Sequence, residues 1–330
     1  MKTLFGKLLI SFALIIVLII ISGMVVFFIV YSRSYEEQII VENYRHAQNT
    51  ARALNFFIAA AYNEVESLAH NIEVISMDTE RQTEVFVCSI RRNPYFELLY
   101  AQGMDGMQTG RSSGALGNRR ERWWFIRMLE TGGRPFVSES YYSVTTSMPS
   151  AAVFYPIMRD GEMIGIMGGD MKLSALHEIV VETANEGSWT YILDGKGVVV
   201  AHPDTTFQEE LYNYVRLTRT VTVRDTAGNP IQTASGNLTE ELPLDISDAY
   251  KAAFADMLRG NISSAKFREG GRTLYLSYRV VPMQGYSDPW YVISVKDGNI
   301  AMRTRNIVIF AILGSSVLII LRFFISCFHL

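Results

Sequence analysis

A run of 24 uncharged residues near the N-terminus constrains this chain more than any other feature. Residues 8–31 read LLISFALIIVLIIISGMVVFFIVY. Because a helix rises ~1.5 Å per residue and a bilayer needs ~20 apolar residues, this run is long enough to span a membrane. It is too long for a cleaved signal peptide, and Lys2 and Lys7 before it favour a cytoplasmic N-terminus. We therefore expect a cytoplasmic segment over residues 1–7 and an uncleaved transmembrane anchor over residues 8–31.

A second apolar run lies close to the C-terminus. Residues 307–321 carry no charge, and Arg322 then precedes FFISCFHL. Arginine near a helix end can extend its charged group to the lipid headgroups, so the run still predicts a transmembrane helix over residues 307–326, followed by a short end at 327–330. Two spans place both termini on one side. We expect residues 32–306 to form one large loop outside the cytoplasm, since loops of this length are translocated largely regardless of charge.

Composition and motifs argue against several classes of protein. The net charge of −3 gives no reason to expect a nucleic-acid partner. Cys88 and Cys327 predict no disulfide framework, and the five histidines form no metal-ligand spacing. The sequence contains no GxSxG, no CxxC and no paired-carboxylate motif. We therefore expect no catalytic residues, no metal and no cofactor, because an ectoenzyme would need a nucleophile–base pair or a metal site.

A long helical pattern follows the first span. Apolar residues alternate at spacings of four and three over more than four heptads: Ile40, Tyr44, Ala47, Ala51, Leu54, Ile58, Ala61, Val65, Leu68 and Ile72. Asp78 can cap a second helix that runs to about Arg92, which completes a helical segment over residues 32–92. The apolar stripe has two interpretations, which different faces of the helix could satisfy together. It can pair two chains as a coiled coil, giving a homodimer, or it can pack against its own globular domain.

The remainder of the loop predicts the same succession of elements twice. The first set comprises a strand over 95–102, a helix over 123–130 and strands over 135–143, 151–158 and 163–168. The second comprises a hairpin over 189–203, a helix over 248–259 and strands over 265–268, 273–281 and 290–295. YAQGMDGMQT and YILDGKGVVV look like one hairpin used twice. We therefore predict an α+β fold with two similar modules, over 93–182 and 183–298, each an antiparallel sheet with helices on one side.

The order of span, long helix, two modules and span resembles the double Cache, or tandem PAS-like, sensor region of bacterial transmembrane receptors, most of all methyl-accepting chemotaxis receptors. The resemblance covers nearly the whole chain. It implies a long N-terminal helix alongside two PAS-like modules, a location in the bacterial inner membrane, and a small ligand bound in the membrane-distal module, 93–182. Such regions also occur in sensor histidine kinases and diguanylate cyclases.

The resemblance extends to candidate ligand-binding residues. Double Cache sensors similar to amino-acid receptors carry arginine, any residue, tryptophan and then an aromatic residue, which matches Arg122, Trp124 and Phe125 in RERWWFIRM. A tyrosine on the following strand matches Tyr141 in SESYYS, and an aspartate ending the last strand matches Asp170 in GIMGGDM. The resemblance implies that the arginine and an aromatic residue hold the carboxylate of the ligand, and that the aspartate holds its ammonium group.

The chemistry of these residue types suits a zwitterion. A guanidinium forms a planar fork that pairs with a carboxylate, aromatic rings exclude water, and a carboxylate attracts an ammonium group. Two departures remove hydrogen-bond donors: Gly117 stands where the family pattern often has tyrosine, and Phe125 lacks the tyrosine hydroxyl. The ligand class therefore stays open between an amino acid, an amine, a carboxylate and another small polar molecule.

The same residues can also be explained by structural roles instead of ligand binding. One of Trp123 and Trp124 is expected in the core, because a helix on a sheet buries one face. Asp170 can instead cap a turn that leads into residues 171–179. A membrane adaptor with a degenerate pocket would then replace the receptor. The chain stops at Leu330, where receptors of this kind continue into a HAMP linker and an output domain, so we expect either a truncated receptor or a separate cytoplasmic signalling partner.

Overall fold

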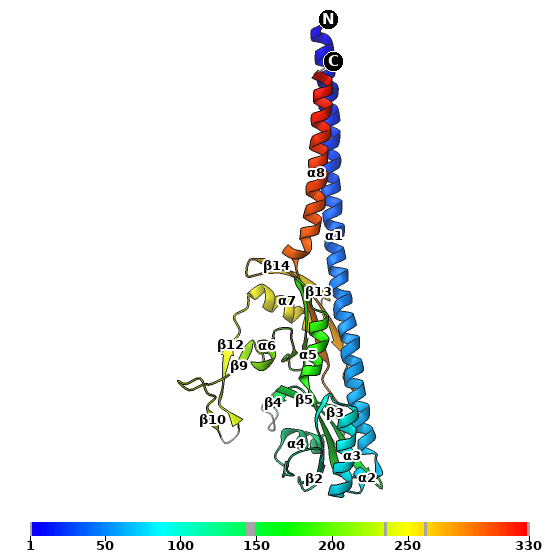
Figure 1. Ribbon diagram of the computed structural model, residues 1–330, viewed down its shortest axis with the longest axis vertical. Coiled ribbons are helices and arrows are strands. Elements are labelled where there is room, and N and C mark those ends of the chain that lie inside the picture. Colours follow the sequence, from blue (N-terminus) through cyan, green and yellow to red (C-terminus); the bar gives the residue numbers. More distant parts are fainter. Residues whose placement is uncertain (1, 143–148, 234–235, 261–262, 329–330) are drawn as a thin grey trace.

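The computed structural model describes residues 2–142, 149–233, 236–260 and 263–328. Ser143, the last residue of one predicted strand, and the final two residues of the segment 327–330 lie outside these ranges. Helix α1 (Lys2–Ala69) runs the length of the molecule, and α8 (Gly298–Phe328) lies beside its first part (Figure 1). Two sheets lie one after the other along the remainder of α1, so the chain forms an elongated rod with both termini at one end.

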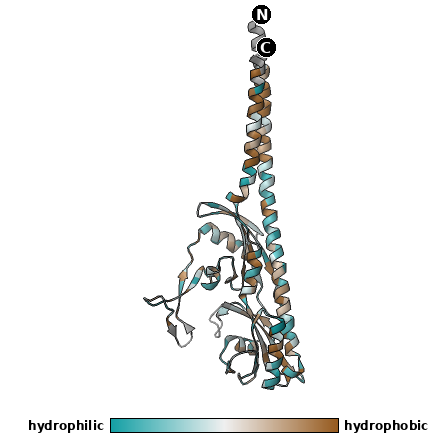
Figure 2. Ribbon diagram, in the orientation of Figure 1, coloured by the Kyte–Doolittle hydropathy of each residue, from teal (hydrophilic) through white to brown (hydrophobic). Residues whose placement is uncertain are grey.

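The paired ends of α1 and α8 have the composition of membrane spans. Both helices are long and apolar enough to cross a membrane, with mean hydropathies of 3.3 and 2.0 in their most apolar windows. Figure 2 shows the apolar residues covering both helices where they run together. The side chains of Leu18 and Phe310 point away from the protein. The predicted spans, 8–31 and 307–326, lie within these two helices, and the protein is a membrane protein on this ground.

The membrane-distal sheet contains six strands in the order β2-β1-β6-β5-β3, with β4 also paired to β5. All its pairings are antiparallel. The strands are β1 (Phe96–Gly103), β2 (Gln108–Arg111), β3 (Phe136–Val137), β4 (Tyr141–Tyr142), β5 (Pro149–Arg159) and β6 (Glu162–Lys172). Asp160 and Gly161 both have positive φ, 52° and 84°, as a two-residue hairpin turn between β5 and β6 requires.

The membrane-proximal sheet repeats this topology. Its order is β13-β14-β15-β7-β8. In each sheet the first strand of the module, β1 or β7, pairs with the last strand, β6 or β15. That last strand also pairs with the strand that precedes it in the sequence, β5 or β14. The strands are β7 (Ser188–Leu193), β8 (Val199–Ala201), β13 (Ser264–Glu269), β14 (Arg272–Val281) and β15 (Trp290–Asp297). The two predicted hairpins do correspond, because Asp105 and Asp194 each accept a hydrogen bond from the backbone two residues further on.

Shorter elements complete the chain. The helices are α2 (Ile72–Ile75), α3 (Thr79–Arg92), α4 (Trp123–Glu130), α5 (Leu173–Glu182), α6 (Thr206–Glu209) and α7 (Asp248–Leu258). Strands β9 (Thr218–Thr222), β10 (Gln232–Thr233), β11 (Gly236–Asn237) and β12 (Thr239–Pro243) build an arm that projects from the proximal module (Figure 1). Asp78 caps α3 as predicted, since its Oδ1 accepts a hydrogen bond from the Arg81 amide at 3.1 Å.

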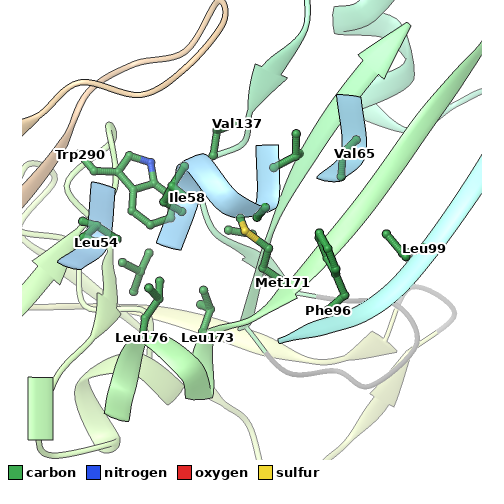
Figure 3. Packing of buried hydrophobic residues seen from close by; sticks show 14 of the residues in the cluster. Leu54, Ile58, Val65, Phe96, Leu99, Val137, Met171, Leu173, Leu176 and Trp290 are labelled. Atoms are coloured by element: carbon green, nitrogen blue, oxygen red, sulfur yellow. The ribbon is translucent and has the colours of Figure 1, made fainter. Parts of the chain in front are cut away.

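The apolar stripe of α1 packs against its own domain. Seven of the ten predicted positions are buried: Ala47, Ala51, Leu54, Ile58, Ala61, Val65 and Leu68. All of them except Ala47 join one core that includes β1, β5 and β6 of the distal sheet and β7, β8 and β15 of the proximal sheet (Figure 3). Trp290 from the proximal module and Met171 from the distal module both belong to this core. The stripe is therefore occupied within one chain, and any contact with a second chain must use another face of α1.

Helices cover both faces of the distal sheet, so the prediction of helices on one side was wrong. Leu99 and Ala101 face α1, whereas Leu98 and Tyr100 join a second cluster with α4 on the opposite face. The proximal sheet is likewise covered by α1 and, on its other face, by the cluster that contains α7. The strands of both sheets carry apolar side chains on both faces, since each face packs against a helix. Helix α5 contacts β7 and β8 as well as β5, so it connects the two modules.

Candidate ligand-binding site

Helix α4 brings the tryptophan pair to the distal sheet. Its first residue follows Arg122, which occupies the N-cap position with extended backbone angles. Gly132 and Gly133 follow its end with φ of 67° and 79°, as is common after the last turn of a helix. The helix is amphipathic, and the side chains of Trp124, Phe125 and Met128 are buried against the sheet. The start of α4 therefore lies over the face of the sheet opposite α1.

The two tryptophans have different surroundings. Trp124 is 3% exposed and stacks on Phe154 of β5, with ring centroids 4.9 Å apart and an angle of 16° between the planes. Trp123 is half-buried and meets the ring of Tyr141 edge-on at 5.7 Å. Trp124 is thus the core residue of the pair. Trp123, which the family pattern leaves as any residue, packs on a predicted ligand-binding residue.

Asp170 lies at the centre of the polar residues on this face. It belongs to β6, where Leu98 of β1 and Ala152 of β5 are its neighbours across the sheet, and it is 7% exposed. Its Oδ1 accepts hydrogen bonds from the Tyr141 hydroxyl at 2.9 Å and from the Tyr100 hydroxyl at 3.4 Å. It does not cap a helix, because it lies inside a strand and Lys172 occupies the N-cap of α5.

A glycine opposite Tyr100 makes this arrangement possible. Gly168 pairs with Tyr100 across β1 and β6. A Cβ atom at position 168 would lie 2.5 Å from the Tyr100 Cζ atom, far inside van der Waals contact. The tyrosine ring therefore lies over the glycine and directs its hydroxyl toward Asp170. The GG pair in GIMGGDM is explained by this contact and by the close approach of α1 at Gly169.

The carboxyl group of Asp170 is poised between its two ionisation states. The pKa of Asp170 is raised to about 7, mainly by burial and also by the negative charge of Glu97, while the hydrogen bonds from Tyr141 and Tyr100 and the charge of Arg111 act in the opposite direction. Burial, together with the charge of Asp170, also raises the pKa of both tyrosines well above the usual value. The tyrosines therefore remain hydrogen-bond donors. A cation placed at this site would favour the ionised carboxylate.

Two arginines contribute positive charge to Asp170 and its tyrosine partners. Arg122 is half-buried, and its positive charge opposes the rise in the pKa of Tyr100 and Tyr141. Arg111 of β2 is buried, and its Nη1 donates to Gln108 Oε1 at 3.2 Å. Burial and the nearby charge of Arg119 lower the pKa of Arg111. The site thus combines positive groups at its edge with an acidic centre.

Three of the five predicted residues, Trp124, Tyr141 and Asp170, lie together on this face of the sheet, and Arg122 occupies the N-cap position of α4. Phe125 is 1% exposed and lies in the aromatic core next to Trp124, so it is placed to support the site from within. The family pattern did not include Tyr100, Trp123, Arg111 or Glu97. Strand alternation could have indicated Tyr100, because it shares the face of Leu98. The other three residues could be recognised only once the pairing of β1 with β6 and the position of α4 on the sheet were known.

The fold and this site together define a class of protein: a two-module sensor domain of the extracytoplasmic type, with its polar site in the module far from the membrane helices. Residues 31–304 match the Cache domain family, and the chain belongs to this family. The resemblance seen in the sequence is therefore confirmed.

Solved structures similar to this chain include ligand-binding domains of chemoreceptors. That of CtaA from Pseudomonas fluorescens, in complex with L-leucine, has 14% sequence identity and a TM-score of 0.58, covering 82% of this chain and 99% of its own. That of PctB from Pseudomonas aeruginosa PAO1, with L-Arg, has 16% identity and a TM-score of 0.55 over 81% and 98%. That of PctC from the same organism, with GABA, has 18% identity and a TM-score of 0.52 over 81% and 100%. The family and these structures belong to sensor domains rather than to enzymes.

Proposed function

We propose that this chain is the sensor region of a bacterial transmembrane receptor of the chemotaxis type, located in the inner membrane with residues 32–306 outside the cytoplasm. Its ligand is a small molecule with an ammonium group, either an amino acid or a related amine. The observation that carries the proposal is the buried carboxyl group of Asp170, which two tyrosine hydroxyls and a tryptophan-lined helix start surround. The same sensor region could serve a histidine kinase or a diguanylate cyclase.

Each polar group has a role in this proposal. The ammonium group of the ligand binds the Asp170 carboxylate, and Tyr100 and Tyr141 hold that carboxylate in place. The ring of Trp123 lies beside Tyr141, so it can cover the ammonium group from one side. A ligand carboxylate, where present, would pair with the Arg122 guanidinium. The ligands named for CtaA, PctB and PctC, L-leucine, L-Arg and GABA, each carry an ammonium group and a carboxylate.

Contacts between the two modules could transmit a conformational change from the site to the membrane helices. Ser140 precedes Tyr141, and both its backbone N–H and its hydroxyl donate to Asp194 Oδ2, at 2.8 and 2.9 Å. Asp194 lies in the turn between β7 and β8 of the proximal sheet. In that sheet β15 continues directly into α8 at Gly298. A shift of β4 on ligand binding would therefore be passed through the proximal sheet to a membrane helix.

We also propose that the receptor is a homodimer through the outer face of α1. The apolar stripe of this helix is used within the chain, but Val41 and Phe56 lie on the other side, and Phe56 is 73% exposed. These two side chains would lose apolar surface to water in a contact with a second copy of α1. A cytoplasmic partner or output region would receive the signal.

Thermal unfolding of the purified full chain in detergent, with a panel of amino acids, amines and small carboxylates, tests the proposal. A ligand at ~100 times its dissociation constant should add ~2.7 kcal/mol of stability, which is visible as a higher midpoint. Arg122→Ala and Asp170→Ala should each abolish the shift, whereas Arg120→Ala, an exposed neighbour, should retain it. If no compound in the panel moves the midpoint, the adaptor with a degenerate pocket becomes the better interpretation.

A further inference from the structure

Strand β1 contains an irregularity beside the candidate site. Phe96 pairs with Met171 of β6 and Leu98 pairs with Asp170, so Glu97 is an extra residue between two successive pairs. A bulge of this kind turns a side chain away from the direction that regular alternation would give it, and bulges are frequent next to functional sites.

The bulge changes which face of the sheet Glu97 occupies. Phe96 belongs to the core on the α1 face, whereas Leu98 belongs to the aromatic cluster on the α4 face. In a regular strand these two residues would share one face, and Glu97 would point away from the site when Leu98 points toward it. In the bulge, Glu97 and Leu98 together oppose Asp170 on the partner strand, and the negative charge of Glu97 raises the pKa of Asp170. The bulge therefore brings a second carboxylate next to Asp170.

Glu97 has an unused acceptor in this position. Its Oε1 atom is buried, and among the residues that the structure describes no donor forms a hydrogen bond with it. A buried carboxylate oxygen without a donor is costly, and a second acidic group nearby increases that cost. Asp170, in contrast, already receives two tyrosine hydroxyls. A ligand with a second cationic group would supply a donor and a positive charge to Glu97 as well as to Asp170.

We infer that Glu97 is a second anionic contact in the ligand site, and that the site takes ligands with a cationic group in addition to the ammonium held at Asp170, such as a basic amino acid or a diamine. This inference rests on the proposed function and narrows its ligand class. In a basic amino acid, the two cationic groups would bind Asp170 and Glu97, and the carboxylate would face Arg122. Binding removes the repulsion between the two carboxylates, which favours such ligands over those with one ammonium group.

A matched pair of probes tests this inference on the full chain in detergent by isothermal titration calorimetry. L-lysine and L-2-aminoheptanoate have the same length, but the second replaces the side-chain ammonium with a methyl group. The wild-type chain should bind L-lysine at least about tenfold more tightly, as expected for one charge-assisted contact in a desolvated site. Glu97→Gln should reduce the ratio to about one by weakening only L-lysine. Glu130→Gln, on the exposed side of α4, should leave the ratio unchanged.

The outcomes separate this inference from the proposed function. If the wild-type chain binds both probes equally, or if Glu97→Gln keeps the preference for L-lysine, the role of Glu97 is refuted while a receptor for ammonium ligands stands. If neither probe nor any diamine binds, the inference about Glu97 is refuted, and the proposed function is refuted only if the wider panel of amino acids and amines also fails to bind. Glu97→Asp provides a second variant that keeps the charge and shortens the side chain. It should retain part of the preference, so that the result does not depend on the folding of the glutamine variant alone.

Discussion

The buried carboxyl group of Asp170 predicts that ligand affinity depends steeply on pH. Without ligand, burial raises its pKa to about 7, so near neutral pH the site is divided between a neutral acid and a carboxylate. An ammonium ligand binds the carboxylate and therefore lowers this pKa in the complex. Binding must then release a proton wherever the free site is protonated, and affinity must rise as pH rises toward and through 7.

The size of the effect follows from that pKa. A carboxyl group with a pKa near 7 is about 1% ionised at pH 5 and about 90% ionised at pH 8, so a ligand that binds only the ionised form should bind about 90-fold more weakly at pH 5. The ligand itself does not titrate in this range, because an alkylammonium has a pKa of about 10.4. His202 does not contribute either, since burial lowers its pKa to about 4.

Calorimetric titration at pH 5, 6, 7 and 8 measures this dependence, with the tightest binder from the panel. At pH 6, buffers of different ionisation enthalpy should report the release of most of one proton for each ligand bound. Asp170→Asn should bind weakly and with no dependence on pH, and circular dichroism should show that it is folded. An affinity that is constant from pH 5 to pH 8, or that increases toward acid pH, would refute the assignment of Asp170 as the ammonium contact.

Three further predictions concern stability. The pKa of Asp170 is raised from 3.8 to about 7, so between these two pH values the folded chain holds a proton that the unfolded chain has lost. The free energy of unfolding should therefore fall by about 4 kcal/mol as pH rises from about 4 to about 7. Asp170→Asn should remove this dependence in denaturant unfolding. Gly169→Ala should destabilise the fold by about 1–3 kcal/mol, because a Cβ atom would lie 2.7 Å from Val65 Cγ2; a thermal midpoint equal to wild type would contradict this packing. Asp194→Asn should cost about 1–3 kcal/mol, since it leaves a buried donor of Ser140 without its acceptor, and an unchanged unfolding midpoint would argue against this contact between the modules.

Local pattern was sufficient for many of the elements. The uncharged runs, the cap at Asp78 and the glycines after α4 each act within a few residues, so their effects can be read without the fold. The helix at the tryptophan pair begins at Trp123, as expected. The sequence predicted that one residue of the pair lies in the core but did not indicate which one. Trp124 is the residue stacked in the core, and Trp123 is the one beside Tyr141, because the rotation of α4 on the sheet decides this.

The apolar stripe of α1 shows the limit of periodicity. Its heptad spacing predicts a helix with one apolar side, and it cannot distinguish a second chain from the sheets of the same chain. The tertiary structure decides the matter, since Leu54, Ile58 and Val65 are buried against both modules. The helices on both faces of the distal sheet were missed for a related reason. A strand that is apolar on both sides shows no simple alternation.

Two apolar spans and an α+β architecture with repeated modules could be predicted from the sequence, because charge, hydropathy and turn chemistry act locally along the chain. The sensor class came from the family resemblance. It also indicated Arg122, Tyr141 and Asp170 through a family pattern. Only the tertiary structure brought Tyr100 and Glu97 to Asp170. That proximity depends on the pairing of β1 with β6 and on one bulge, and register between strands distant in sequence is set by packing on both faces of the sheet.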